Sequence, residues 1–216
     1  MMKNIVFLGA PAAGKGTQSA FIIRDYGIVQ ISTGAMLRAE VKEGNELGLL
    51  AGEYMSNGSL VPDKIIIDII RNRLEQPDCR KGFILDGFPR TIAQAEALDS
   101  MLHNELGVEL THVISLEISD ELIYDRVTGR RSCPECGRVY NITFNPPQKS
   151  DVCDFDGAEL IQRSDDTKET LTKRLEVYRE STAMLKQLYA KRNKLLIVDA
   201  TRLPDEVYKE IKGFIE

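Results

Sequence analysis

Short apolar runs recur along the chain, and longer segments with a helical spacing of apolar residues lie between them. Each run contains β-branched residues and ends at a glycine or a polar residue, which is typical of strands buried in a sheet. The predicted strands are residues 4–8, 28–31 (the weakest), 82–85, 112–116 and 194–198. The predicted helices include residues 92–102, 171–189 and 207–215. Because strands alternate with helices, we expect an α/β fold with a five-stranded parallel sheet flanked by helices.

Two segments interrupt this alternation. Residues 32–61 read as helical throughout, whereas residues 129–163 have no helical period and contain three of the four cysteines. A structureless loop of that length is unusual inside a compact domain, so we expect a small insert with its own staple. The expected division is a core of residues 1–31, 62–128 and 164–216, with inserts at 32–61 and 129–163.

Two residue pairs have the spacing of a capping box, in which a helix-start side chain and one three residues later bond each other's backbone N–H groups. Asp166 and Glu169 stand at the start of the longest predicted helix. Thr91 and Gln94 stand at the start of the helix that follows the third strand. We therefore expect these two helices to be capped by Asp166 and Thr91.

The composition is that of a globular protein, with 43% hydrophobic residues in a chain of 216. The 33 acidic and 28 basic residues give a net charge of −5, which argues against a broad electrostatic grip on nucleic acid. No apolar stretch approaches the length of a membrane span, and the N-terminus does not resemble a signal peptide. We expect a cytoplasmic protein with neither a nucleic acid nor a membrane as partner.

Residues 9–17 (GAPAAGKGT) directly follow the first strand and precede a helical segment. They match the phosphate-loop pattern G-x-x-x-x-G-K, except that Gly16 follows the lysine and the hydroxyl comes at Thr17. Small residues let backbone N–H groups surround a phosphate, and Lys15 can reach the β and γ phosphates. The alternative is a glycine-rich turn with an exposed lysine, but the strand–loop–helix context favours a nucleotide.

Polar residues also follow the second and third strands, in residues 31–38 (ISTGAMLR) and 86–91 (DGFPRT). Ligands bind at the carboxyl ends of strands in open parallel sheets, and the planar guanidinium groups of Arg38 and Arg90 suit a monophosphate. Taken alone, Arg38 is equally well interpreted as a solvent-exposed charge on a helix. Asp86 ends an apolar strand and needs a cation to face; it is otherwise a helix cap or an ion-paired carboxylate.

Five arginines flank or begin the cysteine-bearing segment of this acidic chain. They are Arg126, Arg130, Arg131, Arg163 and Arg174. Phosphoryl transfer depends on such a positive field, because the moving group carries charge on three oxygens and catalysis is positioning plus electrostatic stabilisation. The alternative for any one of these arginines is a surface charge that faces solvent. We expect this alternative to hold for Arg131.

The clustered cysteines have the spacing of a metal site. Cys133 and Cys136 form a C-x₂-C pair, and Cys153 with Asp156 repeats it with aspartate in the last place. Three thiolates and a carboxylate suit tetrahedral zinc, and four protein ligands leave no open position, so the zinc would be structural. Asp154 is too near Cys153 to repeat the spacing. The alternatives are ordinary buried cysteines or a disulfide with a leftover thiol, which a cytoplasmic setting disfavours.

Six ordered segments, which together span nearly the whole chain, resemble those of adenylate kinases. They are residues 9–17, 32–38 (STGAMLR), 58–63 (GSLVPD), 83–91 (FILDGFPRT), 129–131 (GRR) and 163–166 (RSDD). The resemblance implies a P-loop nucleoside monophosphate kinase fold that catalyses ATP + AMP = 2 ADP with Mg²⁺. It implies that residues 32–61 bind AMP and that residues 129–163 form a lid, zinc-stapled in one branch of the family. It also suggests a monomer.

The resemblance implies three sets of site residues besides the metal ligands. The catalytic set is Lys15, Asp86, Arg90, Arg130, Arg163 and Arg174. The ATP-binding set is Ala12, Ala13, Gly14, Lys15, Gly16, Thr17, Arg126, Arg130, Val139, Tyr140 and Arg202. The AMP-binding set is Thr33, Arg38, Ser59, Leu60, Val61, Gly87, Phe88, Pro89, Arg90, Gln94, Arg163 and Arg174. For Gln94 the capping role remains the simpler interpretation of the isolated residue.

Two residues depart from the family pattern. Ala12 stands where the family has glycine, and Ala35 stands where it has aspartate. A methyl group at Ala12 would crowd the loop if that residue needs a positive φ.

Two other functions remain as alternatives. The first is the same reaction with UMP, CMP or GMP as acceptor. The second is a zinc-ribbon module that binds nucleic acid or protein and keeps a vestigial nucleotide site. The acidic balance and the complete set of lysine and arginine residues argue against the second.

Overall fold

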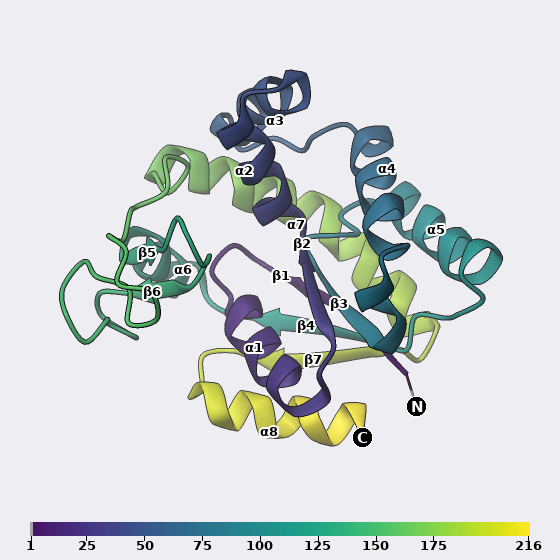
Figure 1. Cartoon of the computed structure of the whole chain (residues 1–216). Coiled ribbons are helices and arrows are strands. Elements are labelled where there is room, and N and C mark those ends of the chain that lie inside the picture. The colour runs from purple at the N-terminus through teal and green to yellow at the C-terminus, as the bar shows by residue number, and fades with distance from the viewer. Residues whose placement is uncertain (1) are drawn as a thin grey trace.

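The computed structural model describes residues 2–216 and contains a five-stranded parallel sheet with helices on both faces (Figure 1). The strands are β1 (Lys3–Gly9), β2 (Val29–Ser32), β3 (Gly82–Asp86), β4 (His112–Glu117) and β7 (Leu195–Asp199). Their order in the sheet is β2-β3-β1-β4-β7, and every pairing is parallel. The predicted fold class is confirmed, and each predicted strand lies within one residue of the observed one.

Helices cover both faces because the strands are apolar on both. The helices are α1 (Lys15–Tyr26), α2 (Thr33–Glu43), α3 (Glu46–Ser56), α4 (Asp63–Leu74), α5 (Ile92–Ser100), α6 (Asp120–Thr128), α7 (Lys168–Lys191) and α8 (Pro204–Ile215). A 3₁₀ turn (Pro77–Lys81) precedes β3, and a π turn (Met101–Glu105) continues α5.

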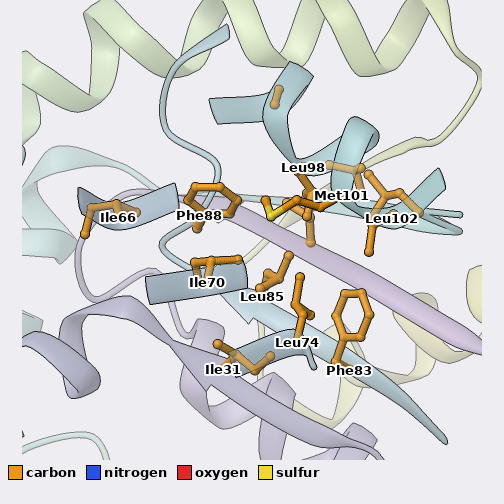
Figure 2. Close-up of a cluster of buried hydrophobic side chains, with 14 of the residues drawn as sticks. Ile31, Ile66, Ile70, Leu74, Phe83, Leu85, Phe88, Leu98, Met101 and Leu102 are labelled. Carbon is orange, nitrogen blue, oxygen red and sulfur yellow. The ribbon is translucent and has the colours of Figure 1, made fainter. Parts of the chain in front are cut away.

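Two apolar cores lie on opposite faces of the sheet. In β1, Val6 and Leu8 belong to one core, while the alternate residues Ile5 and Phe7 belong to the other. The first core packs β3 against α4 and α5, where Phe88 joins it at the end of the strand (Figure 2). The second core packs the sheet against α1 and α8. Strands buried on both faces explain why they are continuous apolar runs in the sequence.

The segment 32–61 is helical, as predicted, and its two helices pack very closely. Gly44 ends α2 in the left-handed conformation, and the Asn45 side chain caps α3 by accepting from Gly48 N at 2.7 Å. A Cβ on Gly48 would lie 2.0 Å from Glu40 O, so glycine is required at this contact. The end of the segment contacts α7, where Thr170 Oγ1 donates to Ser56 O at 3.2 Å.

The segment 129–163 contains no helix, and two short antiparallel strands organise it. These are β5 (Arg130–Ser132) and β6 (Val139–Asn141), and an isolated bridge joins Ser132 to Ile161. The segment has its own small core, which consists of Cys133, Tyr140, Cys153 and Leu160. In Figure 1 it projects from the main body at the left, beside α6.

One of the two capping predictions is wrong by a residue. Helix α7 is capped by Thr167, whose Oγ1 accepts from Thr170 N at 3.2 Å, whereas Asp166 is ion-paired with Arg130. The ion pair takes the Asp166 carboxylate, so the next side chain caps the helix. The Thr91 cap on α5 is confirmed, since Thr91 Oγ1 accepts from Gln94 N at 3.1 Å. The capping box is incomplete, because Gln94 Oε1 accepts from Arg90 N instead of Thr91 N. Among the described residues, no helix has the length and apolarity that crossing a membrane requires.

Candidate active site

The phosphate loop lies between β1 and α1, at the carboxyl end of the central strand. Gly14 precedes α1 with a φ of 100°, and Ala12 has a φ of 59°. The Lys15 ammonium group donates to Gly9 O and Ala10 O, both at 2.9 Å, and so lies inside the loop. The loop therefore has the strand–turn–helix geometry that presents backbone N–H groups and a lysine to a phosphate.

Asp86 lies next to this lysine because β1 and β3 are neighbours and Phe7 pairs with Asp86. Its Oδ1 is 4.0 Å from Lys15 Nζ, and its Oδ2 accepts from Gln30 Nε2 at 3.2 Å. The cation that this carboxylate was expected to face is thus supplied by Lys15, which is the ion-paired alternative considered above.

A cluster of arginines lies beyond the strand ends, and its residues come from three parts of the chain. Arg174 Nη1 donates to Asp165 at 2.9 Å, and Arg130 makes a bidentate, buried pair with Asp166. Arg163 Nε donates to Ser132 Oγ at 2.9 Å. Arg90 Nε donates to Gly87 O at 2.8 Å, which orients its guanidinium.

Burial and mutual repulsion lower the pKa values in this cluster. The pKa of Lys15 is lowered to about 8, chiefly by burial, which the charge of Asp86 opposes and the charges of nearby arginines reinforce. Burial and Arg174 lower the pKa of Arg90 to about 10, and burial with Arg130 and Arg38 lowers that of Arg163 to about 9. Cations that depress one another's pKa values make a strong site for a polyanion.

Two adjoining cavities lie among these cations and are lined by Lys15, Arg38, Arg90 and Arg174. The residues that line the first cavity include nine of the AMP-binding residues predicted above, namely Thr33, Arg38, Ser59, Leu60, Val61, Gly87, Arg90, Gln94 and Arg174. The second cavity borders the phosphate loop and shares Arg90 and Arg174 with the first. Pro89 lines this second cavity, whereas the Phe88 side chain is buried in the core. Residues far apart in the sequence are thus brought together around one positively charged centre.

The ATP-binding residues predicted outside the loop are placed differently. Arg126 donates to Ala200 O at 3.1 Å and approaches Ala12 O at 3.5 Å, directly beside the phosphate loop. Arg202 is exposed and ion-paired with Glu210. Val139 is exposed, while the Tyr140 ring lies in the lid core with its hydroxyl 3.5 Å from Cys153 Sγ. A nucleotide contact by Tyr140 or Arg202 stays a prediction.

One aromatic residue at this site was missed by the sequence analysis. The Arg126 guanidinium lies 5.8 Å from the centroid of the Phe144 ring, which is half exposed. Neither residue has a neighbour in sequence that reveals the pairing. The only local signal in the sequence is that Phe144 directly precedes the turn residues N-P-P at 145–147.

The predicted metal ligands converge in space. One ligand atom from each of Cys133, Cys136, Cys153 and Asp156 lies within 4.8 Å of all the others. Cys136 Sγ and Cys153 Sγ are 3.6 Å apart, and Cys133 Sγ is 3.3 Å from Asp156 Oδ2. Ligands on a tetrahedral zinc are about 3.5–3.8 Å apart for metal–sulfur and metal–oxygen bonds near 2.3 and 2.0 Å, so the donor set fits.

The fold and the site together define a P-loop nucleoside monophosphate kinase. The model of the adenylate kinase family matches residues 7–194. The chain is 50% identical over 213 residues to the adenylate kinase of Methanosarcina barkeri, which covers 99% of this chain and 98% of the relative. It is equally similar to that of Carboxydothermus hydrogenoformans (99% of both chains), and 49% identical over 212 residues to that of a Geobacillus strain (98% of both). The protein belongs to the adenylate kinase family.

Proposed function

We propose that the protein catalyses the reversible transfer of a phosphoryl group from MgATP to AMP, which yields two molecules of ADP. The observation that carries this proposal is that two adjoining cavities, one at the phosphate loop and one between α2, α3 and β3, are lined by the cations Lys15, Arg38, Arg90 and Arg174. Arg130 and Arg163 lie close enough to this group for their charges to act on the pKa values of Lys15 and Arg38 or of each other. Two cavities that share their cations suit a donor and an acceptor that meet at one phosphoryl group.

On the donor side, the phosphate loop and Lys15 bind the ATP phosphates, and the Arg126–Phe144 pair holds the adenine. The ring and the guanidinium present flat faces on which a base stacks, and Arg126 joins this pair to the loop. Mg²⁺ bound with ATP neutralises charge on the β and γ phosphates. Asp86 is ion-paired with Lys15 in the substrate-free protein, and it is the carboxylate that would hold Mg²⁺ when MgATP is bound.

On the acceptor side, Arg38 and Arg90 bind the AMP phosphate, and the cavity residues Thr33, Val61 and Gln94 surround the adenine. Arg130, Arg163 and Arg174 are recruited from beyond the strand ends to the transferred group. Their guanidinium forks match the equatorial oxygens of a phosphoryl group and stabilise its charge in the transition state. The chain supplies no nucleophile, because the AMP phosphate attacks directly.

Water must be excluded from such a site, or ATP would be hydrolysed. We propose that residues 129–163 close over the phosphates as a lid, that residues 32–61 close over AMP, and that the remainder is a rigid core. Arg130 and Arg163 stand near the two ends of this lid, and Arg130 pairs with Asp166 of the core. Both arginines therefore stay beside the phosphates when the lid closes.

The convergent thiols and carboxylate hold a structural zinc ion in the lid. The lid core contains only a few apolar residues, and a segment with so small a core needs a metal or another staple to keep one conformation. We propose further that the protein acts as a cytoplasmic monomer, with nucleotides rather than nucleic acids or membranes as partners. Its net charge of −5 supports the exclusion of nucleic acids.

A coupled assay tests the reaction by supplying ATP with AMP, UMP, CMP or GMP in turn. We expect rapid formation of ADP with AMP and far slower transfer to the other three. Lys15→Met is the matched inactive variant, since it keeps the length of the side chain without its charge. Transfer to none of the four monophosphates would overturn the proposal, and faster transfer to another one would reassign the acceptor.

A further inference from the structure

Asp63 is the first residue of α4, and its carboxylate lies beside the acceptor cavity rather than in it. Its Oδ1 accepts from Gln94 Nε2 at 2.7 Å, and its Oδ2 accepts from Thr91 Oγ1 at 2.8 Å. Gln94 itself is 2% exposed and lines the cavity. Asp63 thus contacts the predicted adenine-reading residue without lining the cavity.

The other end of the Gln94 amide is also held. Gln94 Oε1 accepts from Arg90 N at 2.7 Å, and Thr91 Oγ1 accepts from Gln94 N at 3.1 Å. A backbone N–H group can only donate and a carboxylate can only accept. The amide therefore has one possible orientation, with its oxygen towards Arg90 and its nitrogen towards Asp63.

Both held atoms keep one free hydrogen-bonding position. An amide oxygen has two lone pairs and an amide nitrogen has two hydrogens, and each partner uses only one of them. Gln94 consequently offers the cavity one acceptor and one donor in a fixed order. Adenine presents the complementary pair at its six-membered ring, with the N6 amino group as donor and N1 as acceptor. A 6-oxopurine presents the reverse, O6 as acceptor and N1–H as donor.

From this network we infer that Asp63 sets the base specificity of the acceptor site by preventing the Gln94 amide from rotating by 180°. The inference rests on the proposed function and adds a positioning residue to it. Asp63 acts through Gln94 and touches no nucleotide. A freely rotating glutamine would accept adenine and hypoxanthine alike. Arg90 N holds the oxygen end of the amide and the Asp63 carboxylate holds the nitrogen end, so discrimination between the two bases weakens when the carboxylate is lost.

A series of acceptor analogues tests the fixed orientation in the unmodified protein. The acceptors are AMP, purine riboside 5′-monophosphate, which lacks the 6-amino group, and IMP, a 6-oxopurine. We expect kcat/KM to fall in that order. The purine analogue loses one hydrogen bond to Gln94, whereas IMP places an acceptor against an acceptor and a donor against a donor. The value of kcat/KM for IMP should be about tenfold or more below that for the purine analogue. IMP equal to or better than the purine analogue would overturn the inference.

Asp63→Asn tests the role of the carboxylate, because an asparagine can face either end of the Gln94 amide. We expect the AMP-to-IMP ratio of kcat/KM to fall about tenfold through KM, with KM for ATP unchanged. Asp63→Ser, which suits a helix N-terminus, is the second variant should the first not fold. Asp68→Asn, an exposed acid on the same helix, is the control and keeps the ratio. A folded variant at Asp63 with the native ratio would overturn the inference, while a native protein that phosphorylates no monophosphate would overturn the proposed function instead.

Discussion

Ala12 shows how a single methyl group can strain the backbone of the phosphate loop. Its φ of 59° lies in the left-handed region, where the Cβ of an L-residue is crowded by the following carbonyl. The concern raised by the sequence, that a residue other than glycine is strained here, is therefore realised in the structure. The neighbouring Gly14 adopts its positive φ without such strain.

The Ala12→Gly variant is expected to be more stable than the native protein. Relief of about 1 kcal/mol of strain corresponds to a rise in Tm of about 2–4 °C for a chain of this length. Ala13→Gly is the matched control, because Ala13 is buried and is not among the residues with positive φ. Removal of its methyl group relieves no strain, so we expect this variant to have a lower Tm. Thermal unfolding followed by circular dichroism measures both. A lower Tm for Ala12→Gly would show that the loop is not strained at this residue.

At the scale of elements, the helical segment 32–61, which we propose binds AMP, is joined to α7 by a close contact. Gly58 has a φ of 69°, and a Cβ there would lie 2.9 Å from Thr170 O, against the backbone of the helix. The Thr170 hydroxyl also donates to Ser56 O. Since α7 carries Arg174, this contact links the segment 32–61 to one of the arginines that we propose bind the transferred phosphoryl group.

Replacing Gly58 with alanine should therefore disturb both stability and acceptor binding. We expect lower stability, by more than the roughly 1 kcal/mol of left-handed strain alone, and a higher KM for AMP. Gly44→Ala is a matched control, because Gly44 has a φ of 70° but open space where the Cβ would stand. Urea unfolding and steady-state kinetics separate the two effects. Equal losses in both variants would mean that the contact with α7 contributes nothing.

The proposed zinc site, formed by the three convergent cysteines and Asp156, also belongs to the scale of elements. Metal analysis should find one zinc ion per chain, and chelation should lower Tm, because metal binding contributes to the folding of the lid. Asp156→Ala should weaken zinc retention. Asp154→Asn should not, since asparagine can still accept the hydrogen bond from Gln148 N. Full stability in zinc-free protein would exclude a structural role for the metal.

At the scale of the whole molecule, the site destabilises the fold that holds it. Six buried or half-buried cations are faced by only three carboxylates, those of Asp86, Asp165 and Asp166. The pKa of Lys15, about 8 because of burial, shows that its charge is disfavoured in the folded state. The protein thus retains an electrostatic cost that bound polyphosphate offsets.

Lys15→Met is expected to abolish transfer and yet stabilise the substrate-free protein. Between pH 8 and 10.5 the unfolded chain binds more protons at Lys15 than the folded chain, so stability rises with pH in that window and the charged lysine costs stability below it. The variant should flatten that rise and gain up to about 3 kcal/mol at pH 7. Denaturant titrations at several pH values measure this. Lys64→Met is the control, because Lys64 is exposed. A Lys15→Met variant that is less stable than the native protein would contradict the conclusion that the charge of Lys15 destabilises the fold.

The features that the sequence alone determined are those with local causes. Apolar runs predict strands because a strand buried on both faces must be apolar throughout, and the phosphate loop and the C-x₂-C pair place their ligand atoms within a few residues. The bonded partners of each side chain are a different matter. Asp166 has the spacing of a helix cap, but Arg130, 36 residues away, takes its carboxylate.

Tertiary structure alone decided which distant groups meet and what that does to them. Nothing in the spacing of Asp63 and Gln94, or of Arg126 and Phe144, reveals their contacts, because each pair is joined by packing between separate elements. The lowered pKa values of Lys15 and Arg163 likewise depend on burial and on neighbouring charges that only the folded chain assembles. Local patterns fix the kind of chemistry, whereas long-range packing fixes its geometry, its charge state and its specificity.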